Sequence, residues 1–206
     1  MKERGLAWST LLAAGSLCAA LSAPAHSAII TYNFEAYDDG AVVTTLPGVS
    51  LSNAMVLRSG MSLNEIGFPP KSGAAVIIDD GAPIALSFAS GVYSVAGYFN
   101  YTSGLRLDAY DSADQLLGTV FSSYLANLAD GSGDPGSLPN ELLSFGTGSP
   151  LIAKVVLSGD PAGYSFTLDD LTIVTADRQG VPEPGSWALL ALGAACLVGS
   201  RLRWRG

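Results

Sequence analysis

Short hydrophobic runs alternate with polar residues and turn formers through the middle of this chain. Between Ile29 and Val174 the runs are rich in β-branched and aromatic residues, and Gly, Pro, Asn and Asp separate them. This pattern is typical of β-strands joined by turns. We therefore expect an all-β fold, an antiparallel β-sandwich of nine or ten strands. The clearest predicted strands are residues 29–34, 74–78, 84–88, 92–101, 105–110, 116–121, 151–157, 164–168 and 171–174.

One hairpin is the clearest local prediction. Leu105, Leu107 and Ala109 alternate with more polar residues, as expected of a strand with one buried side. Residues 111–114 then predict a turn, after which the chain returns as the second arm. Farther along, the Gly- and Pro-rich residues 131–139 predict a long connection at one end of the sandwich, where loops often carry binding sites.

The first 27 residues have the three-part build of a secretory signal peptide. Lys2 and Arg4 precede an apolar stretch, residues 6–21, and small residues follow it as far as Ala25 and Ser27. Cleavage after Ala25 or Ser27 would leave small residues at the recognised positions. The alternative is a retained N-terminal anchor, although the apolar stretch is short for a membrane span. We therefore expect the chain to be exported.

The C-terminal end carries a second three-part signal. Pro182, Glu183 and Pro184 precede an apolar run at residues 187–199, and a basic tail at residues 201–205 follows. The run is shorter than the roughly 20 residues that span a bilayer comfortably. We expect a short transmembrane helix with its basic tail on the cytoplasmic side, which places the large domain outside. A plain tail anchor behind a Pro-rich linker is the alternative.

This end of the chain resembles the PEP-CTERM sorting domain, in which a Pro-Glu-Pro motif precedes a short hydrophobic helix and a basic tail. The resemblance implies that Pro182, Glu183 and Pro184 form the sorting motif read by an exosortase, a membrane-bound processing enzyme. It also implies a bacterial exopolysaccharide or biofilm setting, with transient membrane anchoring before release to the cell surface or the extracellular space. The predicted divisions are a signal peptide (1–27), an exported domain (28–175), a linker (176–180) and the sorting signal (181–206).

Composition changes the picture once the two ends are set aside. Both cysteines and all three tryptophans lie in the terminal segments, so the exported domain has no disulfide to stabilise it. Residues 28–180 contain five basic and sixteen acidic residues, a net charge of −11. This charge repels phosphate backbones, so we expect no nucleic-acid partner.

Few catalytic mechanisms fit the exported domain. His26 is the only histidine of the chain and is removed by the later signal cleavage, so a serine triad or a zinc site lacks its usual residue. A glycosidase needs only two carboxylates, but nothing in the sequence singles out a pair among sixteen acids. We therefore expect no catalytic residues and a protein that is not an enzyme, with a secreted glycan hydrolase as the alternative.

Clustered carboxylates suggest a structural calcium ion, because Ca²⁺ binds six to eight oxygen ligands. Asn33, Phe34 and Glu35 in the first strand, together with residues 166–171 in the last, resemble the ends of jelly-roll domains of the galactose-binding and MAM types. In such domains the first and last strands meet, and acids from both hold a cation. The resemblance implies a calcium site. Its predicted ligands are Glu35, Asp38, Asp169 and Asp170.

The alternative interpretation of these acids is ordinary turn chemistry at strand ends. An EF-hand beginning at Asp130 is rejected, because Pro135 stands where that loop requires glycine.

Aromatic residues gather around the predicted hairpin, and aromatic faces make platforms for sugars. We take Tyr98, Tyr101 and Tyr110 as candidate stacking residues, although strand aromatics more often belong to the core or to cross-strand pairs. The leading hypothesis is an exported, non-enzymatic binding or structural module associated with exopolysaccharide. A purely structural coat protein without a ligand is the remaining alternative.

Overall fold

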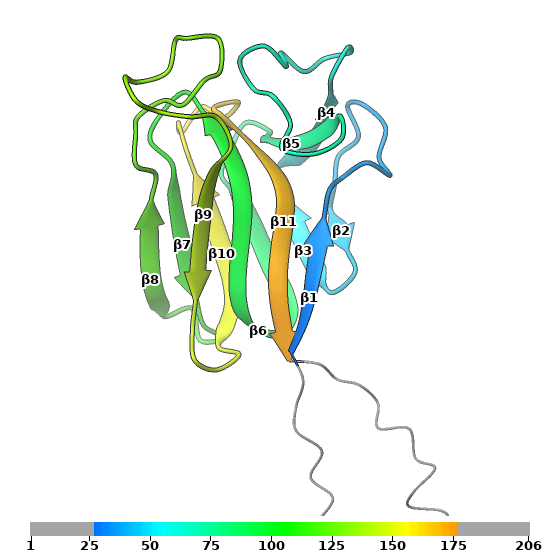
Figure 1. The fold of residues 1–206 in the computed structure, drawn as a ribbon. Coiled ribbons are helices and arrows are strands. Elements are labelled where there is room, and N and C mark those ends of the chain that lie inside the picture. The colour runs from blue at the N-terminus through cyan, green and yellow to red at the C-terminus, as the bar shows by residue number, and fades with distance from the viewer. Residues whose placement is uncertain (1–26, 177–206) are drawn as a thin grey trace, which may run out of the picture.

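Antiparallel strands in two layers make up the part of the chain that the computed structural model describes, residues 27–176 (Figure 1). The predicted all-β sandwich is therefore confirmed. The strands are β1 (Ser27–Tyr32), β2 (Thr45–Leu46), β3 (Val49–Ser52), β4 (Ala54–Arg58), β5 (Ala75–Asp79), β6 (Ile84–Tyr101), β7 (Arg106–Tyr110), β8 (Leu116–Phe121), β9 (Glu141–Gly146), β10 (Ile152–Ser158) and β11 (Phe166–Ala176).

The 18-residue strand β6 belongs to both layers. Its first part pairs with β3 and β10, and the back layer continues from β10 through β7 to β8. Its second part pairs with β9 and β11 in the front layer. Between the two parts, the carbonyl oxygen of Pro150 lies only 2.0 Å from where a Cβ on Gly91 would stand, so this crossing point requires glycine.

The last strand also joins several segments. Its first residues pair with β5, which pairs in turn with β4, and its later residues pair with β1 along their whole length. The first and last strands therefore meet, as the jelly-roll resemblance implied. The register places Ser27 opposite Ala176, so the two ends of the described chain lie side by side at one end of the sandwich (Figure 1).

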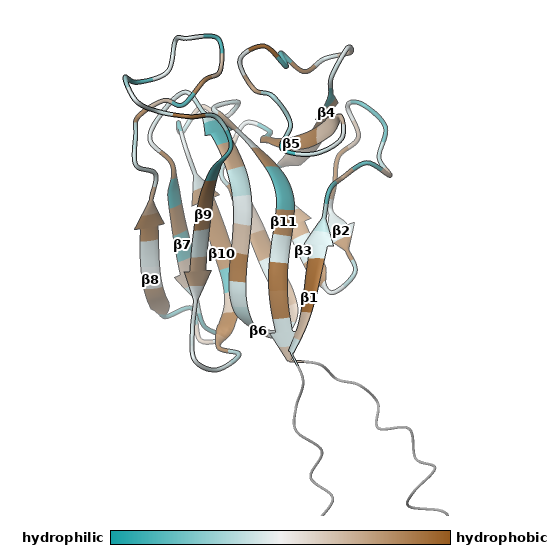
Figure 2. Ribbon diagram, viewed as in Figure 1, coloured by the Kyte–Doolittle hydropathy of each residue, from teal (hydrophilic) through white to brown (hydrophobic). Residues whose placement is uncertain are grey.

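The core lies between the layers and follows the alternation of side chains along each strand. Figure 2 shows apolar and polar segments alternating along β6 and β11. Phe99 and Phe166 pack with their ring centroids 6.2 Å apart, in a tilted arrangement favoured by aromatic pairs. In the hairpin formed by β7 and β8, Leu107 lies opposite Val120, which confirms the predicted pairing and its buried face.

The strand predictions missed four strands and divided two others. Predicted runs 84–88 and 92–101 are one strand, β6, and runs 164–168 and 171–174 are one strand, β11. The missed strands are β2, β3, β4 and β9. The first three are short, because Pro47 and Gly48 form a turn and Asn53 has a positive φ of 56° where the chain turns from β3 into β4.

The long connection between β8 and β9 lies at the end of the sandwich opposite Ser27 and Ala176 (Figure 1). The fully buried Asn127 attaches it to β6. Its Oδ1 accepts the Tyr101 amide at 2.7 Å, and its Nδ2 donates to the carbonyls of Phe99 (2.9 Å) and Leu138 (3.2 Å). One side chain thus satisfies three backbone groups where no strand continues.

The predicted signal peptide at 1–27, except its last residue, and the predicted sorting signal at 181–206 lie outside the described residues. Among residues 27–176, the structure contains no helix long and apolar enough to cross a membrane.

Replacing Asn127 by Ala should lower the free energy of unfolding by about 2–4 kcal/mol, because three buried backbone groups lose their partner. Urea denaturation, monitored by far-UV circular dichroism, measures the change in the free energy of unfolding. Asn64→Ala is the control, since Asn64 is exposed and its side chain forms no hydrogen bond within residues 27–176. Equal stability of the two variants would contradict the anchoring role.

Candidate ligand-binding cleft

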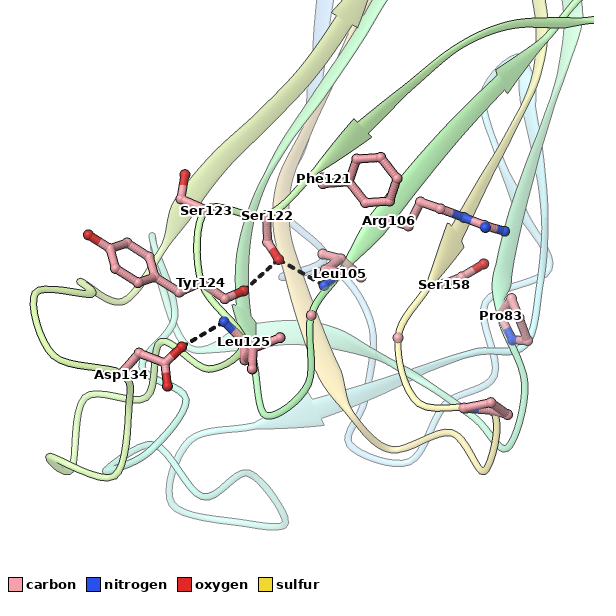
Figure 3. A pocket seen from close by; sticks show the side chains of 13 residues that line it. Pro83, Leu105, Arg106, Phe121, Ser122, Ser123, Tyr124, Leu125, Asp134 and Ser158 are labelled. Carbon is pink, nitrogen blue, oxygen red and sulfur yellow. Dashed lines mark hydrogen bonds between the residues drawn. The ribbon is translucent and has the colours of Figure 1, made fainter.

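A cleft with a volume of about 780 Å³ opens at the loop end of the sandwich, on the side of β7 and β8 (Figure 3). The start of β7, the end of β8 and the following loop form most of its wall, and the segment after β10 completes it. The loop end is thus hollowed, whereas the two ends of the described chain lie at the opposite end.

The apolar part of the cleft comes from the end of β8 and the loop that follows. Phe121 and Leu125 are 68% and 71% exposed, and Tyr124 is half-buried beside them. Local hydrogen bonds hold this segment: Ser122 Oγ accepts the Leu105 amide at 2.9 Å and donates to the Tyr124 carbonyl at 2.8 Å. These hydrogen bonds satisfy backbone groups of Leu105 and Tyr124 within the segment. Exposed apolar side chains gathered in this way are typical of an interaction site.

The carboxylate of Asp134 fastens the other side of the loop. Its Oδ2 accepts the amides of Leu125 at 2.7 Å and Ala126 at 3.3 Å (Figure 3 draws the first of these). Asp134 is the only carboxylate among the residues that line this cleft in the described chain.

The polar part of the cleft comes from the outer face of the back layer. Arg106 lies opposite Phe121 on β8 and opposite Ser158 on β10, so the three side chains share one outward row. Arg106 forms an ion pair with Asp108, with Nε 2.8 Å from Oδ2, and Thr119 Oγ1 donates to Asp108 Oδ1 at 2.7 Å. A cation thus stands beside exposed apolar side chains.

A second hollow of about 350 Å³ adjoins the cleft and shares Ser123 and Tyr124 with it. Glu141 lines this hollow and accepts hydrogen bonds from the amide and hydroxyl of Ser123, at 2.9 and 2.8 Å, and from the Tyr101 hydroxyl. Burial, and then the neighbouring Glu141, raise the pKa of Tyr101. The two hollows are therefore neighbours at the loop end.

The structure corrects one of the three predicted stacking aromatics, Tyr101, and the other two stay predictions. Tyr101 is fully buried and belongs to the core, so it offers no face to a ligand. Tyr98 lies under Lys71, whose Nζ is 4.4 Å from the ring centroid, and Tyr110 lies under Lys154 Nζ at 4.7 Å. None of the three lines either hollow.

Sequence reasoning missed the aromatic residues that do line the cleft, Phe121 and Tyr124. Phe121 ends a predicted strand just before a long loop, and that position was the available signal.

The predicted calcium ligands hold other partners. Glu35 Oε1 accepts the amides of Ala74 and Ala75, both at 2.7 Å, and its Oε2 lies 3.2 Å from Arg58 Nη2. Burial alone would raise the pKa of Glu35, but these two amides and Arg58 hold it below its usual value.

Two further predicted ligands, Asp169 and Asp170, accept hydrogen bonds from residues 59–74, which connect β4 to β5. The fourth, Asp38, lies in a turn. Asp169 Oδ2 accepts the Ser72 amide and Asp170 Oδ1 accepts the Ser72 hydroxyl, both at 2.8 Å. Asp38 is exposed, and its carbonyl accepts the Ala41 amide at 3.1 Å. Within residues 27–176, no group of three or more His, Cys, Asp or Glu side chains is arranged to hold a metal ion. Calcium binding stays a prediction, which unfolding with calcium and with a chelator tests.

Comparison with known proteins identifies a sorting motif at the C-terminal end of the chain. Residues 180–203 match the PEP-CTERM protein-sorting motif. The predicted resemblance is thereby confirmed, and the chain is an exported protein that carries this motif. No curated protein sequence matches it.

Two solved structures show what the sandwich is similar to. One is the K2 cleaved adhesin domain of Lys-gingipain, with 13% identity, a TM-score of 0.45, and coverage of 71% of this chain and 99% of that domain. The other is a family 29 carbohydrate binding module, with 12% identity, a TM-score of 0.38, and coverage of 77% and 96%.

The buried Asp169 predicts a pH dependence of stability. Burial raises its pKa from 3.8 to about 6. The folded chain therefore binds a proton more tightly than the unfolded chain, so stability increases as pH falls through 6 and decreases as pH rises through it. We expect the free energy of unfolding to be about 1 kcal/mol higher at pH 5 than at pH 7 through this group.

Urea denaturation at several pH values measures this effect in Asp169→Asn, where the increase between pH 7 and 5 should be smaller than in the unaltered protein. Asp38→Asn is the control, because Asp38 is exposed and its side chain forms no hydrogen bond within the described residues. An unchanged pH slope in Asp169→Asn would contradict the assignment.

Proposed function

We propose that this exported protein is a non-enzymatic surface or matrix module that binds exopolysaccharide, or another surface glycan, in the cleft at its loop end. The observation that carries the proposal is the combination of exposed Phe121 and Leu125 with Arg106 and Ser158 in one open cleft. Sugars offer apolar C–H faces as well as hydroxyl edges. A cleft with both kinds of surface suits them.

The supply of carboxylates favours binding over hydrolysis. Glycosidases of the common kind need two carboxyl groups on either side of the scissile bond. Asp134, the one carboxylate that lines the cleft in the described chain, already accepts two backbone amides, and Glu141 in the adjoining hollow already accepts hydrogen bonds from Ser123 and Tyr101. A reducing-sugar assay on the purified domain tests the hydrolase alternative, and release of product would overturn the binding-only proposal.

The position of the cleft suits a sorted protein. Ala176, the last described residue, precedes the sorting motif by a few residues and lies at the end of the sandwich opposite the cleft (Figure 1). We infer that an exosortase-type enzyme reads Pro182, Glu183 and Pro184 while the C-terminal segment is in the membrane. The cleft then faces away from the point of attachment.

Replacing Phe121 by Ala should weaken glycan binding by about tenfold or more, because an exposed aromatic platform is lost. A glycan array followed by calorimetry on the best ligand measures this. Leu116→Ala is the matched control, since Leu116 is 57% exposed at the other end of the same strand and does not line the cleft.

Binding of no glycan by the unaltered domain would favour a structural coat protein instead. If Leu116→Ala lowered the glycan affinity as much as Phe121→Ala, the glycan would bind elsewhere on β8.

Changing Pro182, Glu183 and Pro184 to Ala should leave a larger, membrane-bound species in the producing cell, because prolines keep the segment extended for the processing enzyme. Immunoblotting of membrane and extracellular fractions measures it. Alanine at Arg178 and Gln179 is the control just before the motif. Normal processing of the altered motif would defeat the sorting proposal.

A further inference from the structure

The guanidinium of Arg106 lines the cleft with free donors and an ion-pair partner. Arg106 uses Nε for its contact with Asp108, and no hydrogen bond of its two terminal Nη groups is found within residues 27–176. Its side chain is 51% exposed and stands at the cleft beside Ser158 (Figure 3). The two terminal groups are therefore available to a ligand.

The orientation of Arg106 comes from a buried carboxylate beneath it. Asp108 is 4% exposed, and its two oxygens are divided between Arg106 on the same strand and Thr119 on the neighbouring strand. A guanidinium held at Nε in this way loses little side-chain freedom when it binds a ligand. Asp108 and Thr119 are thus positioning residues for Arg106.

The terminal edge of a guanidinium matches a planar carboxylate, which it binds through two parallel hydrogen bonds. Arg106 is the only cation among the described residues that line the cleft, and the apolar side chain of Phe121 stands next to it across the hairpin. A sugar ring against Phe121 would bring a carboxylate on that ring within reach of Arg106.

The domain as a whole is strongly acidic, with a net charge of −11 over residues 28–180. Long-range attraction therefore does not draw an anion to this surface. Recognition of an acidic ligand has to come from short-range geometry at Arg106, which makes it selective for the position of the carboxylate.

We propose that the cleft recognises a carboxylate-bearing glycan, such as a uronic acid polymer, with Arg106 binding the sugar carboxylate and Phe121 packing against the ring. This deepens the proposed function and rests on it. The second hollow, which shares Ser123 and Tyr124 with the cleft, offers room for a neighbouring sugar residue of the same polymer.

The experiment compares polygalacturonate with its fully methyl-esterified form, which has the same backbone without the charge. Calorimetry on the purified domain should show at least about tenfold tighter binding of the acid, since charge-assisted hydrogen bonds to the carboxylate are lost in the ester.

In Arg106→Gln the affinity for polygalacturonate should fall by a larger factor than the affinity for the ester, so that the preference for the acid is lost. Arg106→Lys keeps the charge but not the planar fork, and should recover only part of the preference. Lys154→Gln is the matched control, because Lys154 is a cation on the same outer face that does not line the cleft. Circular dichroism and unfolding midpoints verify that each variant is folded.

Equal affinity for the two polymers, or an unchanged preference in Arg106→Gln, would overturn the carboxylate proposal while leaving glycan binding in place. Binding of neither polymer would overturn it too. The glycan array then decides separately whether the domain binds any sugar.

Discussion

The structure depends on the pairing of a single strand with partners in both layers. β6 is hydrogen-bonded to β3 and β10 over its first part and to β9 and β11 over its second. Strands from distant parts of the chain are thereby held in register with one continuous backbone. The close approach of Pro150 to Gly91 at the crossing point shows how narrow the geometry of this transition is.

Buried polar side chains hold the loops at the loop end in place by binding their backbone groups. Asp79 accepts the amides of Ser165 (2.7 Å) and Phe166 (3.1 Å), and Asn127 binds the long loop to the backbone of β6 at Phe99 and Tyr101. Burial raises the pKa of Asp79, as it does for Asp169. Burying Asp79 and Asp169 has a desolvation cost. The two carboxylates are nevertheless retained, because each satisfies backbone donors that have no strand partner.

The cleft likewise combines paired strands with a loop that polar side chains hold in place. Its floor belongs to the regular hairpin, where Arg106 and Phe121 are cross-strand neighbours, while its apolar side belongs to an irregular loop held by Ser122 and Asp134. A ligand site with one rigid side and one loop side is common, because strands give precision and loops tolerate variation. Arg106 and Phe121, on which the proposed recognition of a charged sugar depends, both belong to the hairpin side.

Sequence alone determined the fold class, the hairpin of β7 and β8, the export of the chain and its sorting motif, because alternation, turn residues and linear signals are local properties. It did not determine which aromatic residues are exposed. Tyr101 and Phe121 both end apolar strands, yet one is fully buried and the other is 68% exposed. Only the tertiary structure decided this, because exposure depends on which layer and which loop cover a strand end. The same holds for Glu35, whose partners Ala74 and Ala75 lie some forty residues farther along the chain.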